Sequence, residues 1–133
     1  MFITAFVCVL ILAFYTFTAY KVGRSRVKHQ VAPPRMDGPE EFLRYFRVQQ
    51  NTLEQMVVVI PLLFIFSYVI SDAIGGILGL VWLAARMWYA FAYYQEARKR
   101  MGGFLIGLLV TVILLIADLV ALGMAVVMIH PLV

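Results

Sequence analysis

The sequence predicts an all-α integral membrane protein, a four-helix bundle that forms a single domain over residues 1–133. Hydrophobic residues occupy 64% of its positions and the mean hydropathy is +0.94, whereas soluble domains contain roughly 45–50% apolar residues. A water-soluble fold of this length could not bury so much apolar surface, so we expect the bilayer to be its solvent. Four apolar runs, separated by charged or turn-forming segments, predict the number of helices.

The first helix is predicted from an apolar run at the start of the chain. Residues 2–20 carry no charge, and 19 such positions are enough for one span. The run lacks a basic start and ends in AYKVGRSR rather than at a small-residue cleavage site, so we interpret it as a retained helix and not a signal peptide. Cys8 is the only cysteine, which excludes a disulfide within the chain and favours a packing role.

The second helix is predicted over residues 39–70. The double proline in VAPPRMDGPEEF cannot continue the first helix, and Pro39 suits the first position of the next. Two glutamates follow, where the helix dipole favours acids. These residues would span roughly 48 Å at ~1.5 Å per residue. The hydrocarbon core measures only about 30 Å, so we expect this helix to project beyond it.

Two further helices are predicted over residues 73–100 and 102–129. Each is apolar apart from one interior charge, Arg86 in the third and Asp118 in the fourth. An ionisable group inside the membrane is costly without a partner. We therefore expect Arg86 to form an ion pair with Glu54 or with Asp118.

The basic residues predict how the chain crosses the membrane. Seven of the eleven lie between Lys21 and Arg47, and three lie at positions 98–100. These two connections fall on the same side, whereas SDAIGG and both termini carry no Lys or Arg. The positive-inside rule then places the basic connections in the cytoplasm and both termini opposite. Because the charge is confined to membrane flanks, nucleic-acid binding is a poor interpretation.

Polar side chains form two stripes near the cytoplasmic edge. Arg47, Asn51 and Glu54 are spaced i, i+4, i+7 and share one helix face. Asn51 and Tyr93 are each 21 positions from Asp72, so both lie roughly 31 Å from that turn at ~1.5 Å per residue. The stripe on the third helix follows the spacing i, i+4, i+7, i+11 and contains Tyr89, Tyr93, Glu96 and Arg100.

Two interpretations of these stripes remain open from the residues alone. They could be a ring of water-exposed polar residues at the membrane edge, together with the aromatic residues that are enriched at that interface. They could also form a binding site, because Glu54 lies where the apolar run begins and would need a partner there. Such a site suits a small anion with several carboxylates, which arginine binds bidentately, and Asn51 or Gln49 could bond its peptide groups. An arginine beside a ligand thiol would also favour its thiolate. The two histidines, His29 and His130, lie far apart in sequence, so no metal site is expected.

Two segments, VAPPRMDGPEEFLRYFRVQQNTLEQ and ARMWYAFAYYQEARKR, resemble the MAPEG family, the membrane-associated proteins of eicosanoid and glutathione metabolism. The resemblance is to the branch that contains leukotriene-C synthase and the microsomal glutathione transferases. That branch has approximately E-R-x-x-R-A-x-x-N-x-x-E on its second helix and R-x-x-Y-x-x-x-Y on its third. The matching positions here are Arg44, Arg47, Asn51, Glu54, Arg86, Tyr89 and Tyr93.

This resemblance implies a homotrimer that binds glutathione, as a cosubstrate, at subunit interfaces near the cytoplasmic face. It implies that Arg100 stabilises the glutathione thiolate, which attacks a hydrophobic electrophile or reduces a lipid hydroperoxide, with no metal. The membrane would be a bacterial inner membrane or the endoplasmic reticulum. The glutathione contacts that it implies are Arg26, Arg47, Gln49, Asn51, Glu54, Tyr89 and Tyr93.

Four positions differ from the synthase branch, so leukotriene synthesis itself is not predicted. Two alternatives to an enzyme remain. One is a non-catalytic lipid-binding member of the same family, although that branch departs at the arginines corresponding to Arg47 and Arg100. The other is a small four-helix drug/proton antiporter, which needs an acidic residue in its first helix, where residues 2–20 have none. The four departures are Val27, Gln55, Trp88 and Ala92.

Overall fold

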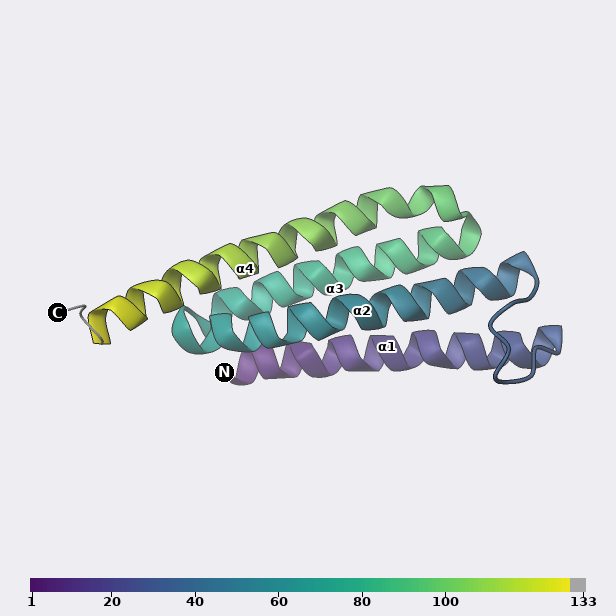
Figure 1. Ribbon diagram of the computed structural model, residues 1–133, viewed down its shortest axis with the longest axis horizontal. Coiled ribbons are helices and arrows are strands. Elements are labelled where there is room, and N and C mark those ends of the chain that lie inside the picture. The colour runs from purple at the N-terminus through teal and green to yellow at the C-terminus, as the bar shows by residue number, and fades with distance from the viewer. Residues whose placement is uncertain (130–133) are drawn as a thin grey trace.

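The computed structural model describes residues 1–129 and confirms the predicted fold class. Its helices run antiparallel along one long axis (Figure 1). All four are long and apolar enough to cross a membrane, counting η1 with the fourth. The elements are α1 (Phe2–His29), α2 (Glu40–Val69), α3 (Asp72–Gln95), the 3-10 turn η1 (Ala97–Arg100) and α4 (Met101–Ile129).

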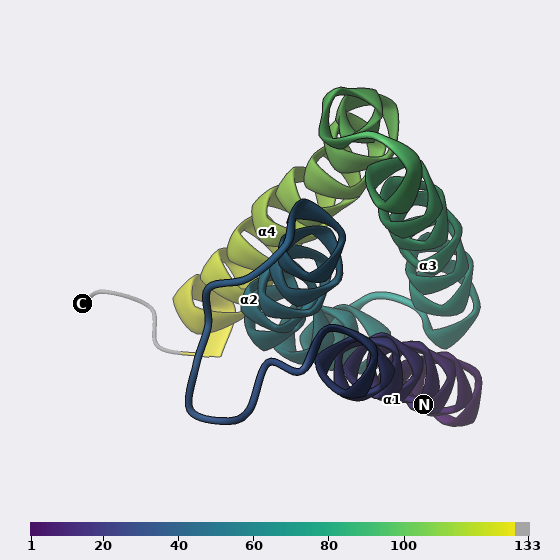
Figure 2. The same cartoon turned by 90° about the vertical axis from the view of Figure 1, so that its right-hand side faces the viewer.

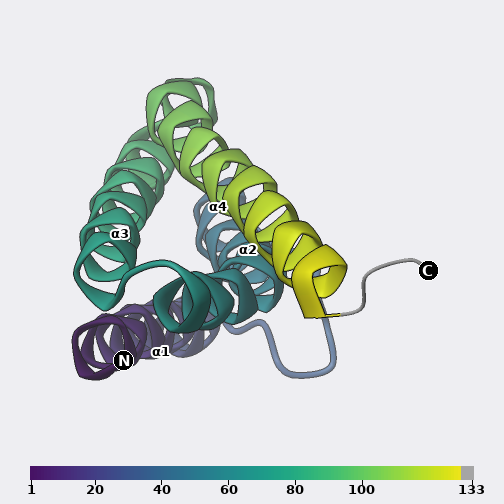
Figure 3. The same cartoon turned by 90° about the vertical axis from the view of Figure 1, so that its left-hand side faces the viewer.

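The two basic connections lie at the same end of the bundle. The loop between α1 and α2 and the turn η1 are together at one end, and the N-terminus and the α2–α3 turn are at the other (Figure 1). Viewed from either end, α3 and α4 are close at η1 and diverge toward the opposite end (Figures 2 and 3). The chain therefore has one basic end and one end without Lys or Arg within the described residues.

Local sequence accounts for most helix ends. α1 continues past its uncharged run to His29 and ends there, with the Gln30 N–H donating to the carbonyl of Val27 (3.4 Å). The left-handed backbone of Gln30 (φ 55°) then lets the N–H of Val31 donate to the carbonyl of Arg26 (3.0 Å). α2 begins at Glu40, with Pro39 as its N-cap, one position later than predicted. The side chain of Ser71 caps α3 by accepting a hydrogen bond from the backbone N–H of Ile74 (3.3 Å).

The end of the third helix differs from the prediction. The helix was expected to reach Arg100, but α3 ends at Gln95 because Glu96 is extended (φ −156°, ψ 129°). η1 then leads directly into α4. This early reversal brings α4 against α3, where a Cβ on Gly103 would lie 2.5 Å from the backbone nitrogen of Tyr89. Only glycine permits so close a backbone approach.

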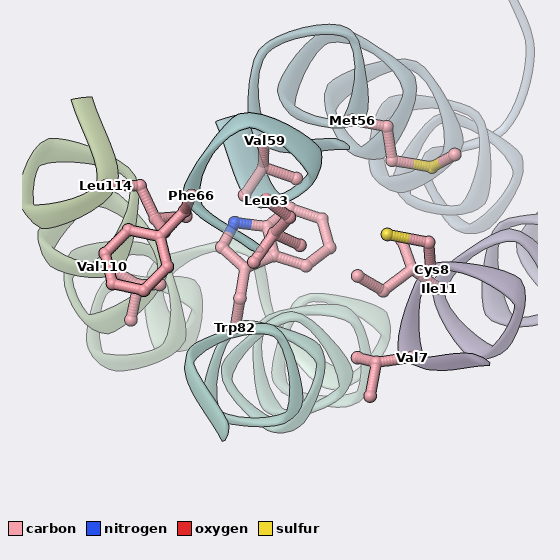
Figure 4. Close-up of a cluster of buried hydrophobic side chains, with 10 residues drawn as sticks. All are labelled: Val7, Cys8, Ile11, Met56, Val59, Leu63, Phe66, Trp82, Val110 and Leu114. Carbon is pink, nitrogen blue, oxygen red and sulfur yellow. The ribbon is translucent and has the colours of Figure 1, made fainter. Parts of the chain in front are cut away.

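The interior of the bundle is built from apolar side chains of all four helices. They point toward a common centre around Trp82, which is fully buried (Figure 4). Most other large apolar side chains are exposed on the outside of the helices, which is the arrangement expected where lipid is the solvent. The central cluster consists of Val7, Cys8, Ile11, Met56, Val59, Leu63, Phe66, Trp82, Val110 and Leu114.

Asp72 joins three helices at the end away from the basic loops. Its carboxylate accepts hydrogen bonds from the backbone N–H groups of Ile3 (3.0 Å) and Thr4 (2.9 Å) and from the hydroxyl of Ser67 (3.0 Å). The Thr4 hydroxyl donates to the backbone carbonyl of Asp72 (3.0 Å). The first turn of α1 has no capping side chain of its own, so a residue of α3 supplies its cap.

We predict that Gly103→Ala destabilises the protein by about 1–3 kcal/mol, because the added methyl would force the α3 and α4 backbones apart. Gly123→Ala is the matched control on the same helix, since a Cβ there would meet nothing within 4 Å. We expect it to be neutral or stabilising by up to about 1 kcal/mol. Thermal unfolding in detergent measures both, and equal midpoints for the two variants would contradict the proposed packing.

Candidate functional site

A cavity of about 210 Å³ lies toward the basic end of the bundle. Five of the eight predicted site residues line it, and they come from α2, α3 and η1. Arg47 and Asn51 are one turn apart on α2, and Tyr89 and Tyr93 are one turn apart on α3. Two stripes on antiparallel helices therefore meet at one depth, as their equal distance from Asp72 predicted.

Arg100 joins the cavity from η1. Its Nη1 donates a hydrogen bond to the hydroxyl of Tyr93 (3.2 Å), and its guanidinium lies 5.3 Å from the centre of that ring. Tyr93 in turn packs against Tyr89, with ring centroids 5.6 Å apart. A guanidinium carries five N–H donors, so one bond to Tyr93 leaves donors for a ligand.

Arg86 does not line the cavity itself, but it holds Asn51, which does. Its guanidinium is buried (2% exposed) and donates from Nη1 to the Asn51 side-chain oxygen (2.9 Å). It also lies over the rings of Tyr89 (4.3 Å) and Trp82 (5.5 Å). The predicted ion pair is therefore wrong: within residues 1–129 Arg86 pairs with a neutral amide, and Asp118 is buried with both oxygens unpaired.

Three predicted residues do not line the cavity. Gln49 follows Arg47 by two positions, roughly 200° around the helix, and its amide donates instead to the Tyr15 hydroxyl (3.2 Å). Arg26 bonds the carbonyls of its own loop, at Val31 (3.3 Å) and Arg35 (2.6 Å). Glu54 shares the face of Asn51, yet it is exposed one turn farther into the span.

Two apolar residues complete the cavity and were not predicted. Met101 and Phe104 start α4, and they reach the cavity because η1 turns the chain back sharply after α3. The sequence shows Gly102 and Gly103 beside them, which is a signal for close helix approach. Glu96, expected on the tyrosine face, ends α3 and lies beside Lys99 (3.8 Å).

The lining determines which ligands the cavity suits. It carries two guanidinium groups, from Arg47 and Arg100, and no carboxylate lines it in the described part of the chain. An amide and two tyrosine hydroxyls add neutral hydrogen-bonding groups, and Met101 and Phe104 add an apolar wall. Such a set favours a small anion with peptide-like polar groups and one apolar side.

No cluster of three His, Cys, Asp or Glu side chains suited to a metal ion occurs within residues 1–129. His29 lies 3.3 Å from a carboxylate oxygen of Glu41, at the basic end of the bundle. His130, the second histidine, is outside the described residues.

Comparison with known proteins finds a matching family model and several similar sequences. The MAPEG family model matches residues 4–120. The chain is 42% identical over 118 residues to an uncharacterized protein of Synechocystis sp., covering 89% of this chain and 86% of that protein. It is 39% identical over 110 residues to microsomal glutathione S-transferase 2 of Mus musculus, covering 83% and 74%. It is 31% identical over 93 residues to leukotriene C4 synthase of Cavia porcellus, covering 70% and 60%.

We predict that Asn51→Ala destabilises the protein by about 1.5–3 kcal/mol, because it leaves the buried Arg86 guanidinium without its hydrogen-bond acceptor. The adjacent Gln50→Ala is the control, since Gln50 has no side-chain hydrogen bond within the described residues and should change stability by less than about 0.5 kcal/mol. Thermal unfolding in detergent distinguishes them. If both variants unfolded at the same temperature, the Arg86–Asn51 bond would not be the stabilising contact.

Proposed function

Because this chain belongs to the MAPEG family, we propose that it is a membrane-bound glutathione transferase acting on hydrophobic electrophiles. The observation that carries the proposal is the cavity in which Arg47, Asn51, Tyr89, Tyr93 and Arg100 meet. The similarity to a microsomal glutathione S-transferase and to a leukotriene C4 synthase supports glutathione as the cosubstrate.

Glutathione fits the chemistry of the lining. It is a tripeptide with two carboxylates, one ammonium group, two amide groups and a thiol, so it is a net anion at neutral pH. Arg47 would bind a carboxylate, since guanidinium groups form charge-assisted bonds with carboxylates. Asn51, Tyr89 and Tyr93 would bond the neutral polar groups. The apolar wall of Met101 and Phe104 would face the part of the site that receives an electrophile from lipid.

Arg100 is our candidate catalytic residue. A positive charge beside the thiol favours thiolate, which is the reactive nucleophile. In conjugation the thiolate sulfur forms a bond to an electrophilic carbon, and the leaving group departs with its electron pair. With a lipid hydroperoxide the same thiolate would take the terminal oxygen and release an alcohol. A second glutathione would then give the disulfide and water.

A homotrimer would complete the site. Glu54 is exposed within the span, where a bare carboxylate facing lipid is costly. A neighbouring copy packed against this face would cover it. The same neighbour could bring Arg26 and Gln49, which the single chain holds away from the cavity, to glutathione bound between subunits.

The site would face the cytoplasm, and both termini would lie on the opposite side of a bacterial inner membrane or the endoplasmic reticulum. The support for this orientation is the concentration of basic residues at the end that holds the cavity. Residues 1–133 would act as one domain in each subunit.

We predict that Arg100→Ala lowers kcat for conjugation of glutathione to a chlorodinitrobenzene-type electrophile about 100-fold or more, because it removes the charge that stabilises the thiolate. The ultraviolet thiolate band on glutathione addition should also be lost. Arg98→Ala is the matched control, since Arg98 lies in the same turn but not in the cavity.

Normal turnover by Arg100→Ala would remove that residue from catalysis. A wild-type protein with neither a thiolate band nor transfer activity would instead favour a non-catalytic lipid-binding member of the family. Size-exclusion chromatography of each variant checks that the assembly is intact.

We predict that Arg47→Ala weakens glutathione binding about 10- to 100-fold, as expected for the loss of a charge-assisted hydrogen bond. Arg44→Ala is the control, since Arg44 lies one turn earlier on α2 and pairs with Glu40 (3.0 Å). Isothermal titration with glutathione measures both. Unchanged affinity in Arg47→Ala would place this arginine outside the site.

A further inference from the structure

A second polar cavity, of about 330 Å³, lies between α1 and α2 and shares no lining residue with the first. We name it the α1–α2 basic pocket. It belongs to the basic end of the bundle, because its residues come from the last turns of α1 and the first turns of α2. Its lining consists of Lys21, Arg24, Ser25, Lys28, Glu41 and Tyr45.

The charges of this pocket leave it net positive. Lys28 is neutralised by Glu41, whose two carboxylate oxygens each lie 3.0 Å from its Nζ. Lys21 and Arg24 have no carboxylate partner within residues 1–129 and instead lie near aromatic rings, Lys21 5.9 Å from Tyr45 and Arg24 5.9 Å from Tyr20. Two cations are therefore available to an anion.

Ser25 supplies the second and independent observation. Its side chain is buried (4% exposed), lines the pocket, and has no hydrogen-bond partner for its hydroxyl in the described chain. Other hydroxyls in the bundle donate to a backbone carbonyl, as in Thr16, Thr18, Thr52 and Thr111. Buried polar groups are normally hydrogen-bonded, so an unpaired donor beside two cations points to a ligand oxygen.

The position of the pocket along α1 indicates where that ligand lies. The 19 uncharged residues 2–20 rise about 28 Å at ~1.5 Å per residue, close to the thickness of the hydrocarbon core. Lys21, which lines the pocket, follows directly after them. The pocket therefore lies at the depth of the lipid headgroups. Tyr20 and Tyr45 beside it are typical of that interface.

We propose that the α1–α2 basic pocket binds the phosphate of an anionic phospholipid headgroup. Lys21 and Arg24 would provide the charge, and the Ser25 hydroxyl would donate to a phosphate oxygen. Basic pockets between helices at the cytoplasmic surface suit such headgroups. A zwitterionic lipid carries the same phosphate, but its ammonium group would be repelled by the two cations. This site is independent of glutathione binding and stands whether or not the protein is a transferase.

The test is lipid binding by delipidated full-length protein, measured by native mass spectrometry with phosphatidylglycerol and phosphatidylcholine as probes. We expect at least tenfold tighter binding of phosphatidylglycerol. Inorganic phosphate and glycerol 3-phosphate carry the same phosphate group in soluble form. They should compete only weakly with phosphatidylglycerol. Equal binding of both lipids, or equal affinity for glycerol 3-phosphate and phosphatidylglycerol, would overturn the proposal.

Substitutions of its lining residues test whether phosphatidylglycerol binds at the α1–α2 basic pocket. The double substitution Lys21→Met, Arg24→Met should weaken phosphatidylglycerol binding at least tenfold, and Ser25→Ala about threefold. Arg98→Met with Lys99→Met removes the same charge from η1, outside the pocket, and should leave binding unchanged. An equal loss in that control would show general charge attraction and overturn the site.

If the double variant fails to fold, the single substitutions decide the question. Lys21→Met, Arg24→Met and Ser25→Ala each alter one side chain of the pocket, and thermal unfolding confirms their integrity. At least one of the two cation variants is expected to weaken phosphatidylglycerol binding severalfold. Full binding by all three would overturn the proposal.

Discussion

The hydrogen bond between Arg86 and Asn51 is the contact on which the arrangement of this bundle's polar end depends. Arg86 is the one charged residue in the interior of α3, and its guanidinium is almost fully buried. Lipid offers no partner for such a group, so the neighbouring helix must supply one. Asn51 does so at 2.9 Å, and this bond joins α2 and α3 at the depth where their polar stripes meet. The cavity lies at this bond because its remaining polar residues follow at helical spacing toward the basic end.

The opposite end is held by a different kind of contact. Asp72 accepts hydrogen bonds from two backbone N–H groups of α1 and from Ser67 of α2, while it belongs to the first turn of α3. Along α2 and α3, the apolar cluster around Trp82 lies between the two polar contacts. Figure 4 shows the side chains of this cluster. Three helices are thus joined at one end, two are paired near the other, and α4 is positioned by the close approach of Gly103 to α3.

The two polar cavities at the basic end differ in what they can recognise. The first combines arginines with tyrosines, an amide and an apolar wall, which suits a peptide anion that meets an apolar partner. The second has two cations and an unpaired hydroxyl beside a tyrosine, which suits a phosphate at the membrane surface. On the two proposals above, the basic residues of this end would serve the orientation of the chain and two separate ligands. A count of charges cannot distinguish these roles, because the basic residues differ only in the side chains that surround them.

The sequence by itself determined the four spans, the common side of the basic connections, and the common depth of Asn51 and Tyr93. These follow from uncharged run lengths and from helical spacing, which are local properties of the chain. Tertiary structure alone decided the partner of Arg86, the end of α3 at Gln95, and the entry of Met101 and Phe104 into the cavity. It also left the Ser25 hydroxyl unpaired. Each of these depends on which side chains neighbouring helices bring within a few ångströms, and spacing along one helix carries no information about the helix beside it.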